Sequence, residues 1–265
     1  MLRRKIDDFL VEWKQKDKKK TLVIEGPRQV GKTKSIVDFA ESNYDKNHFI
    51  YVNFLTNPGM IEIFEPNLDA ERLYNSLKIY YPNKELVKGE SLIILDDIQE
   101  CPRAITALKS FTNNGDYDVI ASGTFLENTY KNLSSFPVGY IERYGMGSLD
   151  FEEFLWANNY KDEMVNNLFL QYENREPLLK ANHTVFLSLF REYMAIGGMP
   201  KVVEQYVKDR DFKQAYNTLE DILDVYYSDI TKYCKKTQIN KVTNCLKSLP
   251  LHLYKDYKKF QLDYF

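Results

Sequence analysis

The sequence lacks several features that would announce a class of function. Its 36 Lys and Arg residues are balanced by 38 Asp and Glu, so the formal net charge is -2 and no overall basicity points to nucleic acid. No apolar run approaches the ~20 residues of a membrane-spanning helix, and residues 1–5 lack an apolar signal core. The sequence therefore predicts a cytoplasmic protein without a membrane partner.

Cysteine and glycine are also scarce. The three cysteines, at positions 101, 234 and 245, show no metal-ligand spacing, and their odd number suits a reducing compartment. Glycine contributes 11 residues, whereas Tyr and Phe contribute 20 and 16. Most of these aromatic residues recur at helical spacing, which favours a place in cores and interfaces over base stacking.

One short segment carries two of the glycines in a meaningful order. Residues 26–33 read Gly-Pro-Arg-Gln-Val-Gly-Lys-Thr, which is the Walker A pattern. The glycines let successive backbone N–H groups face one phosphate-binding concavity. Lys32 is expected to contact the β- and γ-phosphates, and Thr33 to ligate Mg²⁺. The residues expected to bind nucleotide here are Gly26, Pro27, Arg28, Gln29, Val30, Gly31, Lys32, Thr33 and Lys34.

The flanks of this segment supply the context that the motif needs. Residues 21–25 predict a buried strand, and residues 33–42 carry apolar side chains at helical spacing. A helix that begins at the loop adds an anion site at its N-terminus. The alternative is a chance match in an unrelated loop, and the flanks argue against it.

A second motif follows at residues 91–97, where four apolar residues run into two acids in the Walker B pattern. Asp96 is expected to hold Mg²⁺ directly or through water. Asp97 is expected to orient and polarise the attacking water. The expected catalytic residues are thus Asp97, Asp96 and Lys32. A buried strand that ends in an acidic turn would show the same pattern without any catalysis.

Two hydroxyl side chains end the next predicted strand, at Ser122 and Thr124. Both should reach the same edge of the sheet, where one could contact the γ-phosphate or the attacking water. Because they alternate about Gly123, the sequence leaves open which of them faces the site. Turn chemistry alone explains these hydroxyls almost as well.

Strand and helix patterns alternate through the first half of the chain. Strands are expected at 22–25, 49–54, 92–96, 119–122 and 140–144, and helices at 3–14, 33–42, 68–81 and 103–111. Such alternation predicts a parallel sheet with helices on both faces. We expect an α/β P-loop NTPase fold of the additional-strand (ASCE) type, with five parallel strands in the order 5-1-4-3-2, followed by a helical lid domain.

The strand signals stop near residue 151, and apolar residues between 212 and 226 recur at intervals of three and four. We expect residues 1–150 to form the ATPase core, 151–230 a helical lid and 231–265 a lysine-rich segment. The segment from Asp229 to Phe265 contains eight lysines and three aspartates, so it carries a local positive charge. This tail is either the beginning of a DNA-binding segment or a solvated helix face.

Six blocks along the chain resemble one known family. They are Gly26–Thr33, Asp96–Arg103, Ala121–Thr124, Phe136–Gly139, Leu149–Leu155 and Gly197–Pro200. In this order they resemble the bacterial and archaeal AAA+-like ATPases with an archaeal-type ATP-binding domain, relatives of the STAND signalling ATPases. The resemblance implies an ATPase core and a helical lid, followed by a winged-helix segment and a domain of unknown function. By comparison with the family, we expect this sequence to end about where the family's C-terminal part would begin.

The resemblance also assigns roles by position. It implies that Lys32 and Thr33 bind phosphate and Mg²⁺, that Ser122 and Thr124 form the sensor edge, and that Pro200 faces the base from the lid. A plain turn between helices is the alternative for Gly197–Pro200.

The sequence departs from the family pattern in three places. Asp97 stands where Glu is usual, so its carboxylate is one methylene short. In the family an arginine often follows the glycine that corresponds to Gly139, and Tyr140 stands there in this sequence. Arg143 or Arg28 is then the candidate cation for the γ-phosphate. Gly147 and Ser148 replace an aromatic-proline pair, which should soften the hinge into the lid.

The motifs together predict an ATP-binding protein, a slow Mg-dependent ATPase that drives a conformational cycle. A nucleotide-dependent switch with little turnover is the alternative, which the short side chain of Asp97 favours. A small-molecule kinase is disfavoured, because residues 184–229 offer only Arg191 and Arg210 for an arginine-rich lid. The expected ligands are ATP or ADP with Mg²⁺, and the expected partners are a protein, a second copy of the chain or DNA.

Overall fold

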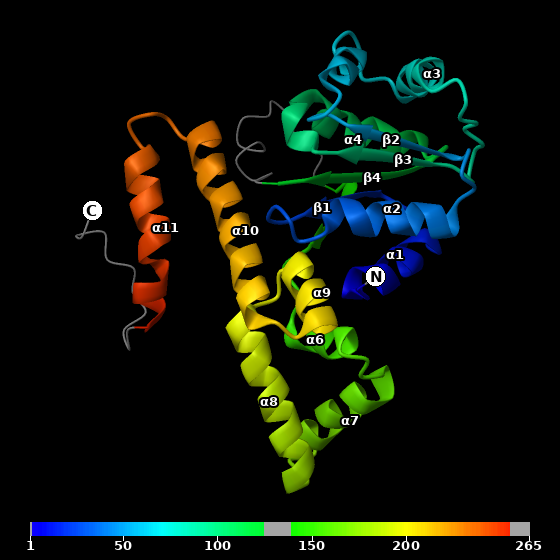
Figure 1. Cartoon of the computed structure of the whole chain (residues 1–265). Helices are drawn as coiled ribbons and strands as arrows, with labels where there is room; N and C mark the ends of the chain where they lie inside the picture. Colours follow the sequence, from blue (N-terminus) through cyan, green and yellow to red (C-terminus); the bar gives the residue numbers. More distant parts are fainter. Residues whose placement is uncertain (1, 125–138, 255–265) are drawn as a thin grey trace.

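The computed structural model describes residues 2–124 and 139–254, and its centre is a sheet of five parallel strands (Figure 1). The strands are β1 (Thr21–Glu25), β2 (Phe49–Asn53), β3 (Leu92–Asp96), β4 (Asp118–Gly123) and β5 (Ile141–Gly145). Their order in the sheet is β2-β3-β4-β1-β5. Read from the other edge this is 5-1-4-3-2, so the expected fold class and strand order are confirmed.

Helices cover both faces of the sheet (Figure 1). One face carries α1 (Lys5–Lys14) and α2 (Lys32–Asn43), and the other carries η1 (Pro58–Phe64), α3 (Ala70–Tyr80) and α4 (Pro102–Asn114). All residues of β3 and β4 are buried, because a central parallel strand is covered on both sides. Trp13, Phe54 and Phe111 are among the buried aromatic side chains, each worth about 1.5–3 kcal/mol of burial.

The second half of the described chain is helical. It contains α6 (Phe151–Ala157), α7 (Asp162–Glu173), α8 (Lys180–Ile196), α9 (Pro200–Asp209), α10 (Phe212–Tyr233) and α11 (Ile239–Tyr254). Its core gathers Phe154, Val202 and Ile222 among other apolar residues. A capping box of Asp150 and Glu153 begins α6, and Asp211 accepts from backbone N–H groups at the start of α10.

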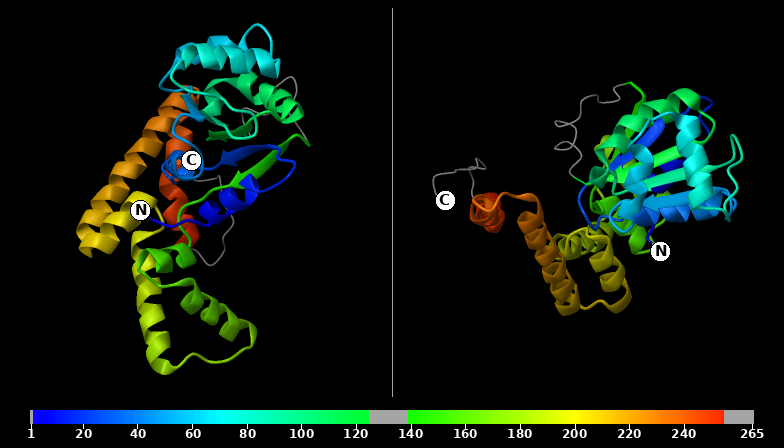
Figure 2. Two further views of the ribbon diagram at one scale, coloured as in Figure 1. Left: turned by 90° about the vertical axis from the view of Figure 1, so that its right-hand side faces the viewer. Right: turned by 90° about the horizontal axis from the view of Figure 1, so that it is seen from above.

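The long helix α10 returns from the helical half towards the sheet, and α11 lies beside it (Figures 1 and 2). Helix α10 runs through residue 230, where the sequence predicted a boundary. The division of the chain into three segments, with boundaries at residues 150 and 230, stays a prediction. Among the described helices, none is both long and apolar enough to cross a membrane.

Candidate functional site

The loop of residues 26–31 joins β1 to α2 at the carboxyl edge of the sheet. Gly31 and Gln29 have φ values of 98° and 63°, so the backbone turns through the left-handed region twice. The first backbone hydrogen bond of α2 runs from Ser35 N to Gly31 O (3.0 Å). The N–H groups of the preceding helical residues have no intrahelical acceptor, as in any first turn, so they offer donors to an anion.

Gly26 is required by a close approach of two segments. A Cβ atom on this residue would lie 1.9 Å from the carbonyl oxygen of Met146, which follows β5. Any side chain would therefore push β1 and the exit of β5 apart. The first glycine of the motif is thus fixed by packing, whereas Gly31 is fixed by its positive φ.

The Lys32 side chain lies over the loop and is buried, with 8% of the residue exposed. Its Nζ donates to the carbonyl oxygens of Gly26 (2.9 Å) and Pro27 (2.6 Å) and to Thr124 Oγ1 (3.2 Å). Burial lowers the pKa of Lys32 to about 8, although Asp96 and Asp97 nearby oppose this. The ammonium is thus charged at neutral pH and held at the centre of the loop.

Asp96 is the hub of the site and is 2% exposed. Its Oδ2 accepts from Thr33 Oγ1 (2.8 Å) and from Tyr51 OH (2.7 Å), and its Oδ1 accepts from Ser122 Oγ. The Walker A hydroxyl and the Walker B carboxylate are therefore in direct contact. Because Thr33 donates its only proton to Asp96, its oxygen lone pairs remain available to a cation.

Asp97 is the next residue after Asp96. Its backbone adopts the left-handed conformation, with φ 52° and ψ 43°. Its Oδ2 accepts from Asn53 Nδ2 (3.0 Å), and its Oδ1 accepts from Gln99 Nε2 (3.0 Å). Gln99 also accepts from the backbone N–H of Thr124 (3.0 Å). Because both Asp97 carboxylate oxygens accept hydrogen bonds from side-chain amides, the orientation of the carboxylate is fixed.

The arrangement fits Mg²⁺ only together with a phosphate ligand. Thr33 and Asp96 supply hard oxygen donors, which Mg²⁺ prefers. The residues that the structure describes contain no group of three or more His, Cys, Asp or Glu side chains that could hold a metal alone. Mg²⁺ commonly takes one or two protein ligands plus phosphate oxygens and water, so this donor set is sufficient for it.

The sequence of the core matches the model of a known family. Residues 18–155, more than half of the chain, match the AAA domain family. The chain belongs to this family. Residues 187–263 match a domain of unknown function, DUF8612.

Comparisons with individual proteins add only distant similarities. The AAA protein described here is similar to AMPPCP-bound DnaA from Aquifex aeolicus, with 13% identity and a TM-score of 0.44 over 97% of this chain and 82% of the other. It is also similar to Drosophila ORC bound to DNA, with 14% identity and a TM-score of 0.43 over 96% and 68%. No curated protein matches it significantly.

The two hydroxyls at the end of β4, Ser122 in the strand and Thr124 just after it, take different positions in the AAA domain. Ser122 is fully buried against Asp96, whereas Thr124 contacts the Lys32 ammonium. Thr124 therefore lies closer to the charge that would meet a phosphate. Ser122 instead helps to orient the Walker B carboxylate.

The other residues expected at the site are spread around the loop. Pro200 begins α9 next to it, since a Cβ on Gly31 would lie 3.8 Å from Pro200 Cγ. Lys34 Nζ turns away and pairs with Asp38 (2.7 Å). Arg143 pairs with Glu25 (2.5 Å), the last residue of β1. Of the block Phe136–Gly139, residues 136–138 lie outside the described residues.

Sequence reasoning missed Tyr51, Asn53 and Gln99. Tyr51 and Asn53 alternate at the carboxyl end of β2, directly beside Asp96 on β3. Polar residues at alternate positions of an otherwise apolar strand were the available signal. Gln99 gave no such signal, because its role depends on a turn after Asp97 that brings it to Thr124.

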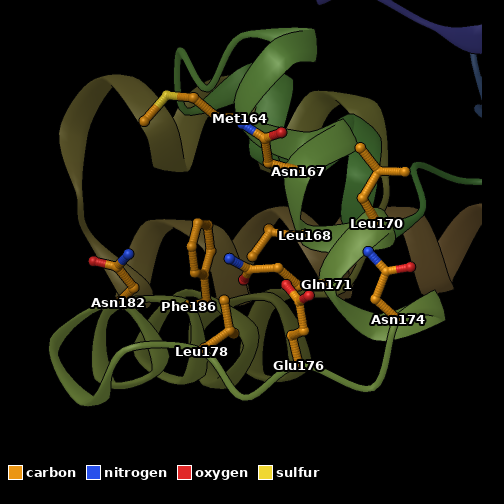
Figure 3. Close-up of a pocket in the computed structure, with 10 residues that line it drawn as sticks. All are labelled: Met164, Asn167, Leu168, Leu170, Gln171, Asn174, Glu176, Leu178, Asn182 and Phe186. Carbon is orange, nitrogen blue, oxygen red and sulfur yellow. The ribbon is translucent and has the colours of Figure 1, made fainter.

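A separate hollow of about 400 Å³ lies between α7 and α8, away from the loop (Figure 3). Its described lining residues are apolar or carry side-chain amides, and Glu176 is the charged one among them. Such a lining offers no cation to a phosphate, so the hollow is not a candidate nucleotide site. The lining residues are Met164, Asn167, Leu168, Leu170, Gln171, Asn174, Glu176, Leu178, Asn182 and Phe186.

Proposed function

We propose that this AAA domain binds Mg-ATP at the loop of residues 26–33 and hydrolyses it slowly, to drive a conformational cycle of the helices that follow. One observation carries the proposal. The buried Lys32 ammonium, the Thr33 hydroxyl and the Asp96 carboxylate converge at the carboxyl edge of the parallel sheet. This is the set of groups that holds a nucleoside triphosphate and its cation.

The proposed roles follow from these positions. Lys32 and the N–H groups of the loop and the first turn of α2 bind the β- and γ-phosphates. Thr33 and Asp96 hold Mg²⁺, whose charge offsets that of the phosphate oxygens. Asp97 orients the attacking water, and Thr124 contacts the terminal phosphate. Pro200 lies against the loop from α9 and lines the nucleotide from the lid side.

A nucleotide-dependent switch with little turnover is the second candidate. The specific observation in its favour is the state of Asp97, whose two carboxylate oxygens already accept from Asn53 and Gln99. A carboxylate that is shorter than glutamate and held by two amides reaches less far towards a water. In this case the protein holds ATP or ADP and presents a different surface with each.

The partners of the protein are also proposals. We infer that the helical half responds to ATP or ADP and presents its surface to a protein or to a second copy of the chain. The lysine-rich residues 231–265, the proposed beginning of a winged-helix segment, are a candidate contact for DNA. We also propose kinship with the STAND signalling ATPases, which rests on the six sequence blocks alone.

Binding of Mg-ATP to the Lys32→Ala variant tests the proposal. Loss of a charged phosphate contact should remove about 1.5–3 kcal/mol of binding free energy, or about ten- to hundredfold in Kd. The control is Lys88→Ala, an exposed lysine paired with Asp116, which should bind as the parent does. Equal Kd values for parent and Lys32→Ala would overturn the assignment. A steady-state turnover number for the parent then separates the ATPase from the switch.

A further inference from the structure

Helix α10 contacts the phosphate-binding loop at Arg28. The Tyr226 hydroxyl donates to the carbonyl oxygen of Arg28 (3.0 Å), and the Asp229 carboxylate lies 3.2 Å from Arg28 Nε. Tyr226 and Arg28 are 198 residues apart in the sequence. The helical half therefore contacts both the backbone carbonyl and the guanidinium of Arg28.

The same helix also reaches the segment after the Walker B strand. Lys232 Nζ lies 3.4 Å from the carboxylate of Glu100, three residues after Asp97. Tyr226, Asp229 and Lys232 are spaced by three residues, so they share one face over successive turns of α10. We call these three residues the α10 clasp. The clasp therefore contacts the phosphate-binding loop, at Arg28, and the segment after the Walker B strand, at Glu100.

The acidic charge of the clasp, on Asp229, lies almost out of solvent. Asp229 is 8% exposed, so water screens its carboxylate weakly. Its Oδ2 makes the ion pair with Arg28 but no aligned hydrogen bond within the described residues. Tyr226 gives the pair a neutral neighbour, and burial and the Asp229 charge raise the pKa of its hydroxyl. The attraction between Arg28 and Asp229 is thus mostly electrostatic, and a stronger anion can compete for it.

We propose that Asp229 is a positioning residue that sets the preference of the loop for ATP over ADP, through competition between Asp229 and the terminal phosphate for Arg28. The proposal rests on the proposed function, because it requires nucleotide at the loop. ATP carries one more phosphate than ADP towards this guanidinium. When Arg28 turns to the γ-phosphate, the ion pair opens and the last turns of α10, with α11 beside them, are released.

The sign of the effect follows from the charges. The Asp229 carboxylate neutralises Arg28, and the γ-phosphate must displace it to reach this guanidinium, so Asp229 opposes ATP more than ADP. Removing that charge while keeping the side-chain shape should tighten ATP binding and leave ADP binding nearly unchanged. A contact that only stabilises the fold would change both affinities alike, or neither.

The first test compares Kd values of Mg-ATP and Mg-ADP for the full chain and for Asp229→Asn. We expect the ratio of ADP to ATP Kd to rise about fivefold or more, within the usual range of coupling between sites. Asp224→Asn, an exposed acid on the same helix, is the matched control and should keep the parent ratio. In an Arg28→Gln background the added Asp229→Asn change should no longer alter the ratio. An unchanged ratio in Asp229→Asn alone overturns the proposal.

The second test measures backbone amide hydrogen exchange across α10. In the parent, ATP should speed exchange in the last turns of α10 and ADP should not, whereas Asp229→Asn should show the fast exchange without nucleotide. Equal protection of these turns with and without ATP overturns the proposal. If the parent binds ATP through Lys32 but fails either test, only this inference fails. If the parent binds no ATP, the proposed function fails with it.

Discussion

Arg4 and Glu153 form a buried ion pair, with Arg4 Nε 3.0 Å from Glu153 Oε1. The same guanidinium donates to the carbonyl oxygens of Val30 (2.8 Å) and Gly147 (2.9 Å). One side chain therefore joins the residue that precedes α1, the phosphate-binding loop, the exit of β5 and the first turn of α6. These contacts connect the phosphate-binding loop and the sheet to the helical half.

The first prediction concerns the stability that Arg4 provides. Arg4→Ala leaves the Glu153 carboxylate buried without its cation, which should cost about 3–5 kcal/mol of the free energy of unfolding. Arg3→Ala is the matched control. Arg3 pairs with Asp162 and Asp8 at exposed positions, so its loss should cost about 1 kcal/mol or less. Urea unfolding of the three proteins measures the difference, and equal costs would argue against the role of Arg4.

The sequence predicted the parts of the site that are encoded locally. The Walker A and Walker B residues lie within single strand-loop segments, so pattern and flanks sufficed to predict that Lys32, Thr33 and Asp96 lie near one another, while their roles stay a prediction. The pairs Arg4–Glu153 and Arg28–Tyr226 join residues 149 and 198 positions apart. No local pattern announces such contacts, because they depend on how the helical half packs against the loop.

Alternation about Gly123 left Ser122 and Thr124 undistinguished in the sequence, and the structure separates them. Ser122 contacts Asp96 and Thr124 contacts Lys32. The difference arises where β4 ends, because Thr124 already belongs to the turn that Gln99 holds. The 3-10 helix η1 (Pro58–Phe64) was not predicted either, since its short apolar run has no helical period.

The second prediction concerns the pH dependence of nucleotide affinity. Burial lowers the pKa of Lys32 to about 8, and bound phosphates should raise it, because they stabilise the charged ammonium. Below pH 8 the lysine is charged before binding, so the Kd of ATP should not depend on its titration. Above pH 8 binding must take up a proton, and the Kd should rise by up to about tenfold per pH unit.

Isothermal titration calorimetry from pH 7 to 9, in buffers of different ionisation enthalpy, measures this proton uptake. The expected uptake grows from about a tenth of a proton at pH 7 to about nine tenths at pH 9. Lys32→Arg is the control, because arginine stays charged throughout this range. A parent affinity that does not change between pH 7 and pH 9 would contradict the lowered pKa.

The third prediction concerns Asp97 and hydrolysis. Asp97→Asn removes the negative charge but keeps a residue that tolerates the left-handed backbone at φ 52°. Turnover should fall by about 10²–10⁴-fold, the usual contribution of a general base, while ATP stays bound. Asp97→Glu extends the carboxylate towards the water and should raise the rate. Single-turnover hydrolysis and equilibrium ATP binding, measured on the same samples, separate chemistry from affinity.

If Asp97→Asn hydrolyses ATP as fast as the parent, Asp97 does not orient the water, and the switch becomes the better description. Parent turnover that is already negligible would lead to the same conclusion. Asp97→Glu has an added cost, because glutamate adopts the left-handed region less readily than aspartate. Its thermal stability must therefore be compared with that of the parent before its rate is interpreted.

The last prediction concerns the lysines that follow α10. Lys235 and Lys236 are exposed between α10 and α11, and Lys241 and Lys247 lie on α11. The lysines at 255, 258 and 259 lie outside the described residues. If about four of these lysines neutralise phosphates of duplex DNA, affinity should fall about hundredfold between 50 and 200 mM salt.

A titration of duplex DNA at low and at physiological salt measures this slope. Lys235→Ala/Lys236→Ala should flatten it by about two phosphate contacts. Lys18→Ala/Lys20→Ala removes the same charge from exposed positions before β1, so it should leave the slope unchanged. Equal slopes for both double variants would show that net charge alone attracts the DNA. No binding at low salt would make these lysines a solvated helix face, and would direct the search for a partner to proteins.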